Sequence, residues 1–408
     1  MATRLTPPQP GAKKTNSGLM ATIAVIGVIL FIVPLALGVY TDWLWFGDLG
    51  FRGVFTKVVL ARVVLFLIFA ALGGAVTYAA AMVAWRGRPK DGPEADPFSQ
   101  ASPYRAQIES GVRTLLIWVP LVVAVFSGLA GQRAWRTVML WLNGGDFGMT
   151  DAQFGRDLGF YAFALPGISV LLGMLSMLLV VAFLVALVAH YLLGGIRIGS
   201  NVNGIRGHIS SSARIQLAVT AGLWMLIKAV SYWLERYTLL YQQNDIFTGA
   251  SYTAINATLP AKIALMVIAV IVAAAFFASI VYKDFRIPVL ATVLMLVSSL
   301  VIGSIWPAML EQFSVKPNRQ AKEFEYIGRN IEATRYAYGL TDDKVTYLEN
   351  WSAEDVSDEQ VAADEATISN IRLLDPDIIA PTFTQNQQLR NFYGFPETLA
   401  MDRYQVDG

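Results

Sequence analysis

The sequence contains no cysteine and only two histidines, His190 and His208. Without cysteine, the chain forms no disulfide, offers no thiolate nucleophile and holds no zinc or iron–sulfur centre through sulfur. Two histidines are also too few for a multi-histidine metal site. We therefore expect no metal ion and no other cofactor.

Charged side chains are scarce as well. They make up 15% of the 408 residues, against about 25% in an ordinary soluble domain, whereas hydrophobic residues make up 55%. The charges are also divided unevenly. Residues 1–310 carry 22 Lys and Arg against 12 Asp and Glu, a net charge of +10, whereas residues 311–408 carry 9 against 18, a net charge of −9. This distribution indicates a membrane protein whose two parts occupy different environments.

Catalytic motifs are missing too. The sequence has no Gly-rich phosphate loop, no G-x-S-x-G nucleophile elbow and no H-E-x-x-H metal motif. These residues therefore give no indication of an enzyme, and an enzymatic function would need active-site residues outside this sequence. We expect no nucleic-acid partner.

Seven apolar runs are long enough to cross a bilayer, whose hydrocarbon core of about 30 Å needs roughly 20 helical residues. They extend over residues 18–40, 63–85, 114–131, 167–193, 215–233, 263–281 and 288–305. No small-residue cleavage site follows the first run, so we interpret it as an uncleaved anchor and not as a signal peptide. The sequence thus predicts an α-helical polytopic membrane domain with seven transmembrane helices over residues 1–310.

The orientation follows from Lys and Arg, which are retained on the cytoplasmic side of membrane proteins. With a cytoplasmic N-terminus, the inner segments hold thirteen of these residues and the outer segments hold eight. We therefore expect the N-terminus in the cytoplasm and, after seven spans, residues 311–408 on the other side of the membrane.

One ionisable residue lies within a predicted span. Lys228 precedes Trp233 by five residues, roughly 7.5 Å along a helix, and its side chain can carry the ammonium group most of that way to the interface. Glu235, seven residues further on the same helix face, is a candidate partner. We interpret Lys228 as an anchor in an aromatic belt with Trp233 and Tyr237, and the alternative is an ion or proton path.

Small residues recur in the second span, where Ala71, Ala75 and Ala79 lie four residues apart. Helices in lipid approach one another through such small residues. We expect this stripe to pack against a neighbouring helix, and the alternative is a contact between two copies of the chain.

A long loop precedes the fourth span. Its first ten residues, RAWRTVMLWL, alternate charged and bulky side chains and predict a short interfacial amphipathic helix, which Gly144 and Gly145 end. Asp146, Asp151 and Asp157 follow with a spacing that matches no calcium loop. We expect a turn-rich, ordered loop.

The period of the hydrophobic residues changes after Glu311. Phe324, Ile327, Ile331 and Tyr338 recur at helical spacing, and charged residues fill the other face. This pattern predicts a surface helix whose apolar face packs on a domain.

The remaining tail mixes helix and strand signals. Ser357 and Gln360 have the spacing of a capping box at the start of a helix that reaches toward Leu374, and PTFTQNQQLRNFYGF predicts a further helix. Strands are expected at Val345 and Tyr347 and in the final DRYQVDG. Residues 311–408 are thus predicted to begin an acidic, extracytoplasmic α/β domain.

Several long segments resemble a known family. They include YTDWLWF, AQFGRDLGFYAFALP, YWLERYTLLY, GASYTAINATLPAK and, in the tail, VKPNRQAKEFEYIGRNIEATRYAYGL. These segments are similar to those of a family of large, functionally uncharacterised multi-pass membrane proteins of actinobacteria and cyanobacteria. The resemblance implies seven N-terminal spans and a large extracytoplasmic region in a chain roughly twice as long, of which we expect this sequence to be a fragment. It implies no activity, cofactor or catalytic residue.

Three functions are compatible with these features. The leading hypothesis is a non-enzymatic protein of the bacterial plasma membrane whose helix bundle anchors an extracytoplasmic domain that binds envelope proteins or lipids. The alternative is a transporter or lipid-handling protein in which Lys228 contacts the substrate, and the third is an envelope enzyme. All three have the lipid bilayer as a partner, and the sequence does not define an oligomeric state.

Overall fold

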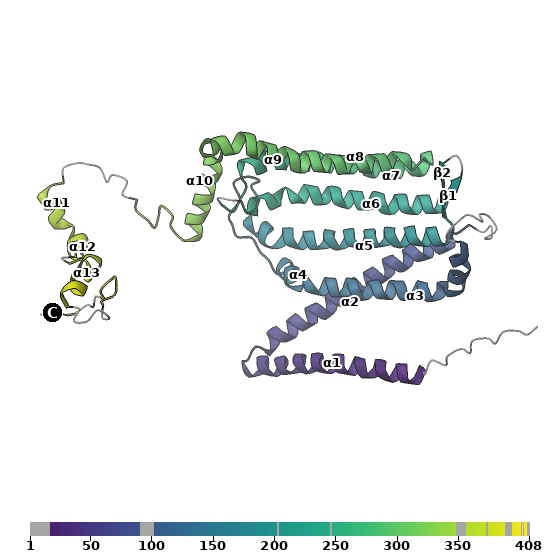
Figure 1. The fold of residues 1–408 in the computed structure, drawn as a ribbon, viewed down its shortest axis with the longest axis horizontal. Coiled ribbons are helices and arrows are strands. Elements are labelled where there is room, and N and C mark those ends of the chain that lie inside the picture. The colour runs from purple at the N-terminus through teal and green to yellow at the C-terminus, as the bar shows by residue number, and fades with distance from the viewer. Residues whose placement is uncertain are drawn as a thin grey trace, which may run out of the picture. The chain divides into compact units, whose positions relative to one another are not determined.

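The computed structural model describes residues 17–89, 102–201, 204–244, 247–347, 356–372, 374–387, 394–400, 402 and 404–405, and these residues are mostly helical (Figure 1). In chain order the elements are α1 Ser17–Asp48, α2 Arg52–Arg86, α3 Ser102–Arg133, α4 Trp135–Leu142, η2 Phe160–Ala164, α5 Leu165–Leu192, β1 Ile196–Asn201, β2 Gly204–Ile209, α6 Ser211–Glu235, η3 Tyr237–Tyr241, η4 Ala254–Thr258, α7 Leu259–Tyr282, α8 Arg286–Leu300, η5 Val301–Ile305, α9 Trp306–Leu310, η6 Glu311–Val315, η7 Lys316–Asn318, α10 Arg319–Ala337, α11 Asp358–Ala363, α12 Glu365–Ile368 and α13 Pro376–Gln387.

Six helical segments of the described residues are long and apolar enough to cross a membrane. They extend over Arg52–Arg86, Thr114–Arg133, Phe160–Leu192, Ser211–Glu235, Ala254–Tyr282 and Arg286–Ala337. Each overlaps one of the second to seventh predicted spans, as expected for a multi-pass membrane protein. The first predicted span lies within α1, where several side chains are outside the described set, so the count of seven stays a prediction.

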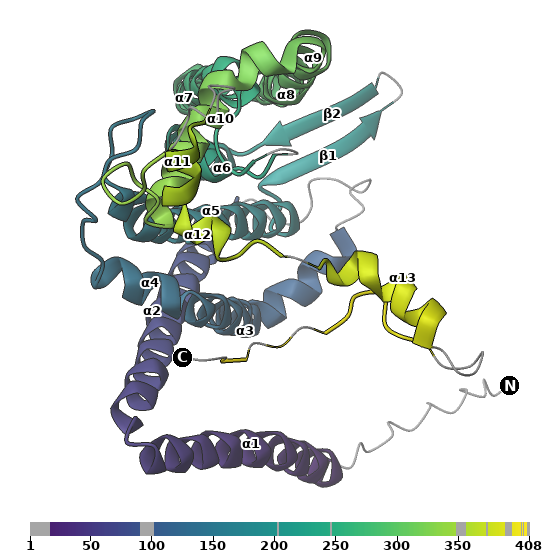
Figure 2. The ribbon, with the colours of Figure 1, turned by 90° about the vertical axis from the view of Figure 1, so that its left-hand side faces the viewer.

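Small residues let α2 and α3 approach closely. A Cβ atom added at Gly73 would lie 2.4 Å from Ser127 Oγ, and one added at Gly131 would lie 2.3 Å from the ring of Phe69. Helix α2 also packs on α5, and α6 packs on α5 and α7. In Figure 2, α6 lies between α5 and α7.

The predicted alanine stripe of α2 faces away from these contacts. Ala71, Ala75 and Ala79 are exposed, whereas Gly73 and Thr77 are buried. The expected packing of the stripe on a neighbouring helix of this chain is therefore wrong. Small residues occur at four-residue spacing on both faces of α2, so the spacing alone does not distinguish the packed face from the exposed one.

Three of the described helical segments contain four π-helical turns between them, and each turn is followed by a proline two residues after it ends. The turns η2, η4, η5 and η6 precede Pro166, Pro260, Pro307 and Pro317. In each case the residue before the proline donates its N–H to the carbonyl five residues back, as Leu165 does to Phe160. A proline ring has no N–H and collides with the carbonyl four residues back, so the preceding turn widens to accommodate it.

A two-stranded hairpin connects α5 to α6, where the sequence analysis predicts no strand. β1 and β2 are antiparallel, with Ile196 opposite Ile209 and Arg197 opposite His208. Gly194, just after α5, has a φ of +79°, which glycine adopts without strain. The two strands contain three glycines, and this composition weakens the strand signal in the sequence.

Two aspartates order the loop between α4 and η2. Asp151 accepts hydrogen bonds from three backbone N–H groups and from the Tyr161 hydroxyl, the last at 2.7 Å. Asp157 accepts hydrogen bonds from three further backbone N–H groups. These contacts confirm the predicted ordered loop, and α4 confirms the predicted short helix before it.

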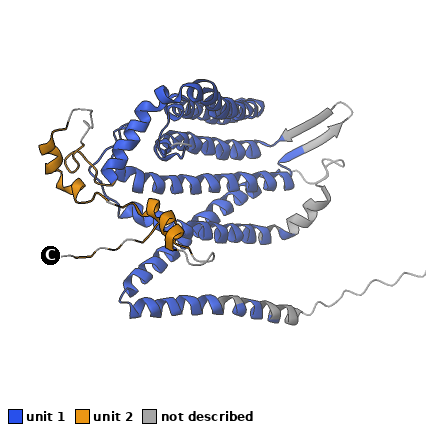
Figure 3. Ribbon diagram, turned by 60° about the vertical axis from the view of Figure 1, so that its left-hand side comes forward, with its two compact units in different colours: residues 1–337 blue, residues 338–408 orange. Residues whose placement is uncertain are grey.

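The chain divides into two compact units, residues 1–337 and 338–408 (Figure 3). In the second unit, Ser357 and Gln360 form the predicted capping box at the start of α11. The predicted reach of this helix toward Leu374 is wrong, because α11 ends at Ala363 and the side chain of Asp364 caps the separate short helix α12 that follows. Helix α13 begins five residues earlier than the predicted PTFTQNQQLRNFYGF helix and includes its first half.

The α/β character predicted for the tail is not confirmed. Val345 and Tyr347 lie in an irregular segment, and the described residues of the second unit contain no strand. Most of DRYQVDG lies outside the described residues. The part of the tail that the structure describes is built from short helices and turns.

We expect Asp157→Asn to loosen the loop. The backbone N–H groups of Phe147 and then Gly159 stabilise the charged carboxylate and so lower the pKa of Asp157. A carboxyl group with a lowered folded pKa stabilises the fold above its unfolded pKa of about 4, and this contribution is lost as the pH falls through the folded pKa. Hydrogen exchange over residues 146–159 at pH 7 should therefore be faster in the variant.

Asp146→Asn is the matched control, because Asp146 lies in the same loop, is exposed and makes no hydrogen bond among the described residues. It should exchange as the wild type does. Acidification toward pH 3 should reduce the protection of the wild-type loop and change that of Asp157→Asn less. Equal exchange in the two Asn variants at pH 7 would contradict the role of Asp157.

Candidate functional site

Helix α10 is held at the start of the helical segment that leads into α7. The carboxylate of Glu323 in α10 accepts the backbone N–H of Tyr252 through both oxygens, at 3.1 and 3.0 Å. Glu323 is only 3% exposed. N–H groups in the first turn of a helix have no partner within the helix and carry its positive dipole end. Glu323 thus caps a helix N-terminus that lies 71 residues earlier in the chain.

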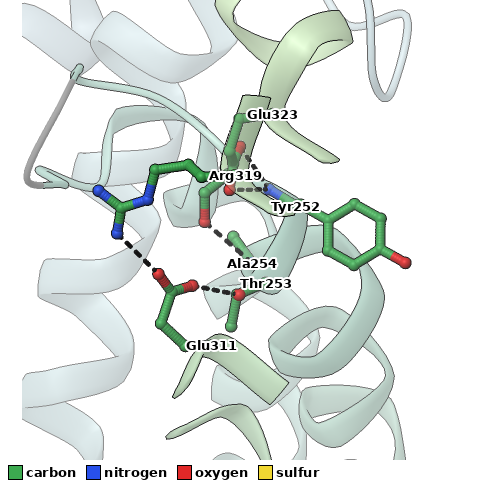
Figure 4. A network of polar contacts seen from close by, with 7 residues as sticks. Tyr252, Thr253, Ala254, Glu311, Arg319 and Glu323 are labelled. Carbon is green, nitrogen blue, oxygen red and sulfur yellow. Dashed lines mark hydrogen bonds and ion pairs between the residues drawn. The ribbon is translucent and has the colours of Figure 1, made fainter. Parts of the chain in front are cut away.

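A second carboxylate lies beside the first (Figure 4). Glu311 Oε2 accepts a hydrogen bond from Thr253 Oγ1 at 2.5 Å, and its Oε1 lies 3.2 Å from Nη2 of Arg319. Ser251 Oγ accepts the N–H of Ala254 at 3.2 Å and caps the same helix start. We refer to Glu311, Arg319 and Glu323, together with Tyr252 and Thr253, as the α10 clamp.

Neighbouring side chains of α10 extend this contact. Lys322 Nζ donates to the hydroxyl of Tyr252 at 3.1 Å. Tyr326 packs edge to face on Tyr252 at a centroid distance of 6.3 Å, and its hydroxyl accepts a hydrogen bond from Asn256 at 3.3 Å. These bonds fix the rotation of α10 about its own axis.

The next turn of α10 contacts two loops. Arg329 Nη1 donates to Gln153 Oε1 at 2.9 Å, in the loop that the two aspartates order. Asn330 Nδ2 donates to the carbonyl of Thr248 at 2.8 Å. One face of α10 is therefore bonded to the loops that precede both α5 and α7.

The polar face of α10 makes these contacts, whereas its apolar face is largely exposed. Phe324 and Ile331 are 77% and 46% exposed, and Tyr338, directly after the helix, is 78% exposed. The predicted packing of this apolar face on a domain stays a prediction, since residues 1–337 and 338–408 form separate units. The polar face packs on the bundle, because the free N–H groups of a helix start need acceptors.

Two cavities flank α10, and charged side chains contribute to the lining of both. One, of about 350 Å³, is lined by residues that include Gln242, Lys316 and Arg319, and the other, of about 390 Å³, by residues that include Asp151 and Arg329. In the described ranges, no three His, Asp or Glu side chains lie close enough together to bind a metal ion. The donors around Glu311 and Glu323 suit the attachment of α10 to the bundle.

The structure places Lys228 and Glu235 in separate interactions. Lys228 Nζ lies 5.2 Å from the ring centroid of Tyr232. Lys262 Nζ lies 5.5 Å from the same centroid and forms an ion pair with Glu235. Among the described residues, no ion pair joins Lys228 to Glu235. Glu235 pairs instead with Lys262, which belongs to α7. The anchor interpretation of Lys228 stays a prediction.

A polar bridge that no sequence pattern predicted joins α5, α6 and α2. His190 Nε2 lies 2.9 Å from Gln216 Oε1, and Gln216 Nε2 donates to the carbonyl of Ala80 at 2.8 Å. His190 is fully buried. Side-chain hydrogen bonds of this kind join helices in lipid, where an unpaired polar group is costly. The sequence feature that could have indicated this bridge is a polar residue near the end of each of two apolar runs, His190 in one and Gln216 in the other.

We expect Glu323→Leu to lower thermal stability in detergent. The substitution leaves the N–H of Tyr252 buried without an acceptor, which costs about 1–3 kcal/mol. Glu323→Gln retains a carbonyl acceptor and should lose less. The matched control is Glu325→Leu on the same helix, since Glu325 forms a surface pair with Arg329 that contributes about 0–0.5 kcal/mol. Equal destabilisation by the two Leu variants would contradict the capping role.

Lys228→Leu should be tolerated. It removes one cation from the ring of Tyr232, an interaction of about 0.5–1 kcal/mol, and also removes a charge from the span. Lys262→Leu leaves Glu235 without its partner and should destabilise more. Thermal stability in detergent and complementation of a deletion strain measure both effects. If Lys228→Leu had normal stability but no complementing activity, the anchor interpretation would fail in favour of an ion path.

Comparison with known proteins places these features in a family. The family model described as "Uncharacterised protein family (UPF0182)" matches residues 19–408. A UPF0182 protein of Corynebacterium glutamicum is 58% identical over 408 residues, which cover 100% of this chain and 41% of that protein. No solved structure matches this chain.

Two other relatives give the same result. A UPF0182 protein of Corynebacterium diphtheriae is 56% identical over 408 residues, which cover 100% of this chain and 41% of that protein. A UPF0182 protein of Rhodococcus opacus is 46% identical over 401 residues, which cover 98% and 40%. This chain thus spans about 41% of the length of the relatives it matches. The match of the family model to residues 19–408, with these actinobacterial relatives, confirms the resemblance: the chain belongs to the uncharacterised family UPF0182.

Proposed function

We propose that this chain is the membrane part of a bacterial envelope protein, and that it anchors an extracytoplasmic region which binds envelope proteins or lipids. The α10 clamp is the observation that carries the proposal. Helix α10 continues from the last apolar helix, and Glu323 and Glu311 bond it to the start of the α7 segment. Burial of a carboxylate costs free energy unless the group is hydrogen-bonded. The buried, bonded Glu323 therefore indicates that α10 is attached to the bundle and is not only a linker.

The charge distribution supports the same function. Residues 311–408 carry 9 Lys and Arg against 18 Asp and Glu, whereas the preceding part carries a net positive charge. The orientation itself follows from the Lys and Arg of the short segments between spans, thirteen inside against eight outside, which favour a cytoplasmic N-terminus and, after seven spans, an extracytoplasmic position for residues 311–408. Because the bundle holds α10 in one rotation about its axis, the chain after α10 leaves the bundle in a defined direction.

A transport function has less support. A polar solute needs hydrogen-bonding partners along its path, because unpaired polar groups are costly in an apolar environment. The cavity between α2, α3 and α5 is lined by aliphatic residues and one tryptophan. Within the described residues, Lys228 contacts an aromatic ring, and it is a poor candidate for a substrate contact.

Single cysteines test the orientation. The chain has no cysteine, and Ser211 and Ser369 are both exposed. A membrane-impermeant maleimide should label the Ser369→Cys variant in intact cells, and it should label the Ser211→Cys variant only after permeabilisation. The reverse pattern would overturn the orientation.

The same two variants of the whole protein test the binding function. A photo-crosslinker attached to Ser369→Cys should give discrete adducts with envelope proteins or lipids. The Ser211→Cys variant, treated in the same way after permeabilisation, should not give these adducts. If the reagent labels Ser369→Cys but no adduct forms, the binding function is contradicted while the orientation still holds.

A further inference from the structure

An apolar groove lies between α3 and α5, with α2 beneath it. Its volume is about 320 Å³, within the range of about 300–1,000 Å³ that is typical of ligand pockets. Helix α2 packs on both α3 and α5, whereas α3 and α5 contact one another little. The space between these two helices forms the groove, and every residue that lines it is Ala, Val, Leu or Trp.

A cationic group lies at one end of this groove. The guanidinium carbon of Arg88 lies 3.5 Å from the ring centroid of Trp85, and Nη1 donates to the Trp85 carbonyl at 3.1 Å. Because Trp85 lines the groove, Arg88 stands at its edge. Arg86 adds a second cation in the last turn of α2. A guanidinium has five N–H donors and can bind a phosphate through two of them at once.

We propose that this groove binds one acyl chain of an anionic phospholipid, and that Arg88 binds the phosphate of the same lipid. Trp85 is itself a wall residue of the groove, and its ring centroid lies only 3.5 Å from the guanidinium carbon of Arg88. The apolar walls therefore begin within a few ångströms of the guanidinium, as the acyl chains of a phospholipid begin just below its headgroup. Arginine beside tryptophan is also typical of membrane interfaces.

The charge at the groove end distinguishes this occupant from other lipids. A zwitterionic lipid would fill the same walls, but its positive headgroup would lie beside Arg86 and Arg88. An anionic lipid has no such repulsion. A polar solute would leave its hydrogen-bonding groups unpaired against the aliphatic walls. This inference does not depend on the anchoring function.

Native mass spectrometry of the purified protein tests the proposal, with phosphatidylglycerol as the anionic probe and phosphatidylcholine as the zwitterionic probe. The wild type should retain one phosphatidylglycerol through detergent exchange. It should retain phosphatidylcholine at least about tenfold less, which corresponds to about 1.4 kcal/mol. Equal retention of the two lipids by the wild type would overturn the proposal.

Two substitutions on α5 test the groove itself. Val188→Trp fills the groove and should reduce retention of phosphatidylglycerol at least about tenfold, which corresponds to about 1.4 kcal/mol. Leu187→Trp is the matched control, because Leu187 is the neighbouring exposed residue and does not line the groove. Val119→Trp fills the groove from α3 and replaces Val188→Trp if thermal unfolding shows that the latter does not fold. Unchanged retention in the folded groove variants, or an equal loss in Leu187→Trp, would overturn the proposal.

A further pair tests the headgroup contact. Arg88→Gln should abolish the preference for phosphatidylglycerol while binding of the acyl chain persists. Arg286→Gln removes an exposed arginine at the start of α8 and should leave the preference unchanged. A preference that survives in Arg88→Gln, or is lost equally in Arg286→Gln, would show that Arg88 does not bind the phosphate.

Discussion

In a bilayer the backbone has no water to bond, so each N–H and C=O group must find its partner within the protein. The described structure can be understood from this constraint. The spans are helices, and at Pro166, Pro260, Pro307 and Pro317 the preceding turn of the helix widens into a π-helical turn. Where helices meet, polar side chains also find partners within the protein, as Gln216 does when it donates to the carbonyl of Ala80.

The same constraint explains why α10 presents its polar face to the bundle. The helical segment that leads into α7 begins with N–H groups that have no carbonyl partner within the same helix. Glu323 reaches one of them from α10, and Glu311 holds the adjacent threonine while it pairs with Arg319. The apolar residue Phe324 is consequently turned outward, although its spacing in the sequence suggests a packed face.

The sequence predicted the spans well because each depends on a local property, a run of apolar residues between charged ones. The interactions that join distant segments could not be derived in this way. Lys262 pairs with Glu235 across 27 residues, and Glu323 caps Tyr252 across 71. The strands of the hairpin are rich in glycine and depend on pairing with each other, so neither is evident alone. The prolines that follow each π-helical turn, such as Pro166, were a local signal that the sequence analysis did not use.

The two π-helical turns between α8 and α10 have a consequence for helical phase. Each turn holds one residue more than an α-helical turn and so rotates everything after it by roughly 100°. The faces of α10 are therefore out of phase with those of α8, although the chain between them is helical throughout. In such a segment the loss of a single residue in η6 would turn Glu323 away from Tyr252 while leaving every side chain of α10 unchanged. For the attachment of α10, the number of residues in these turns matters as much as their identity.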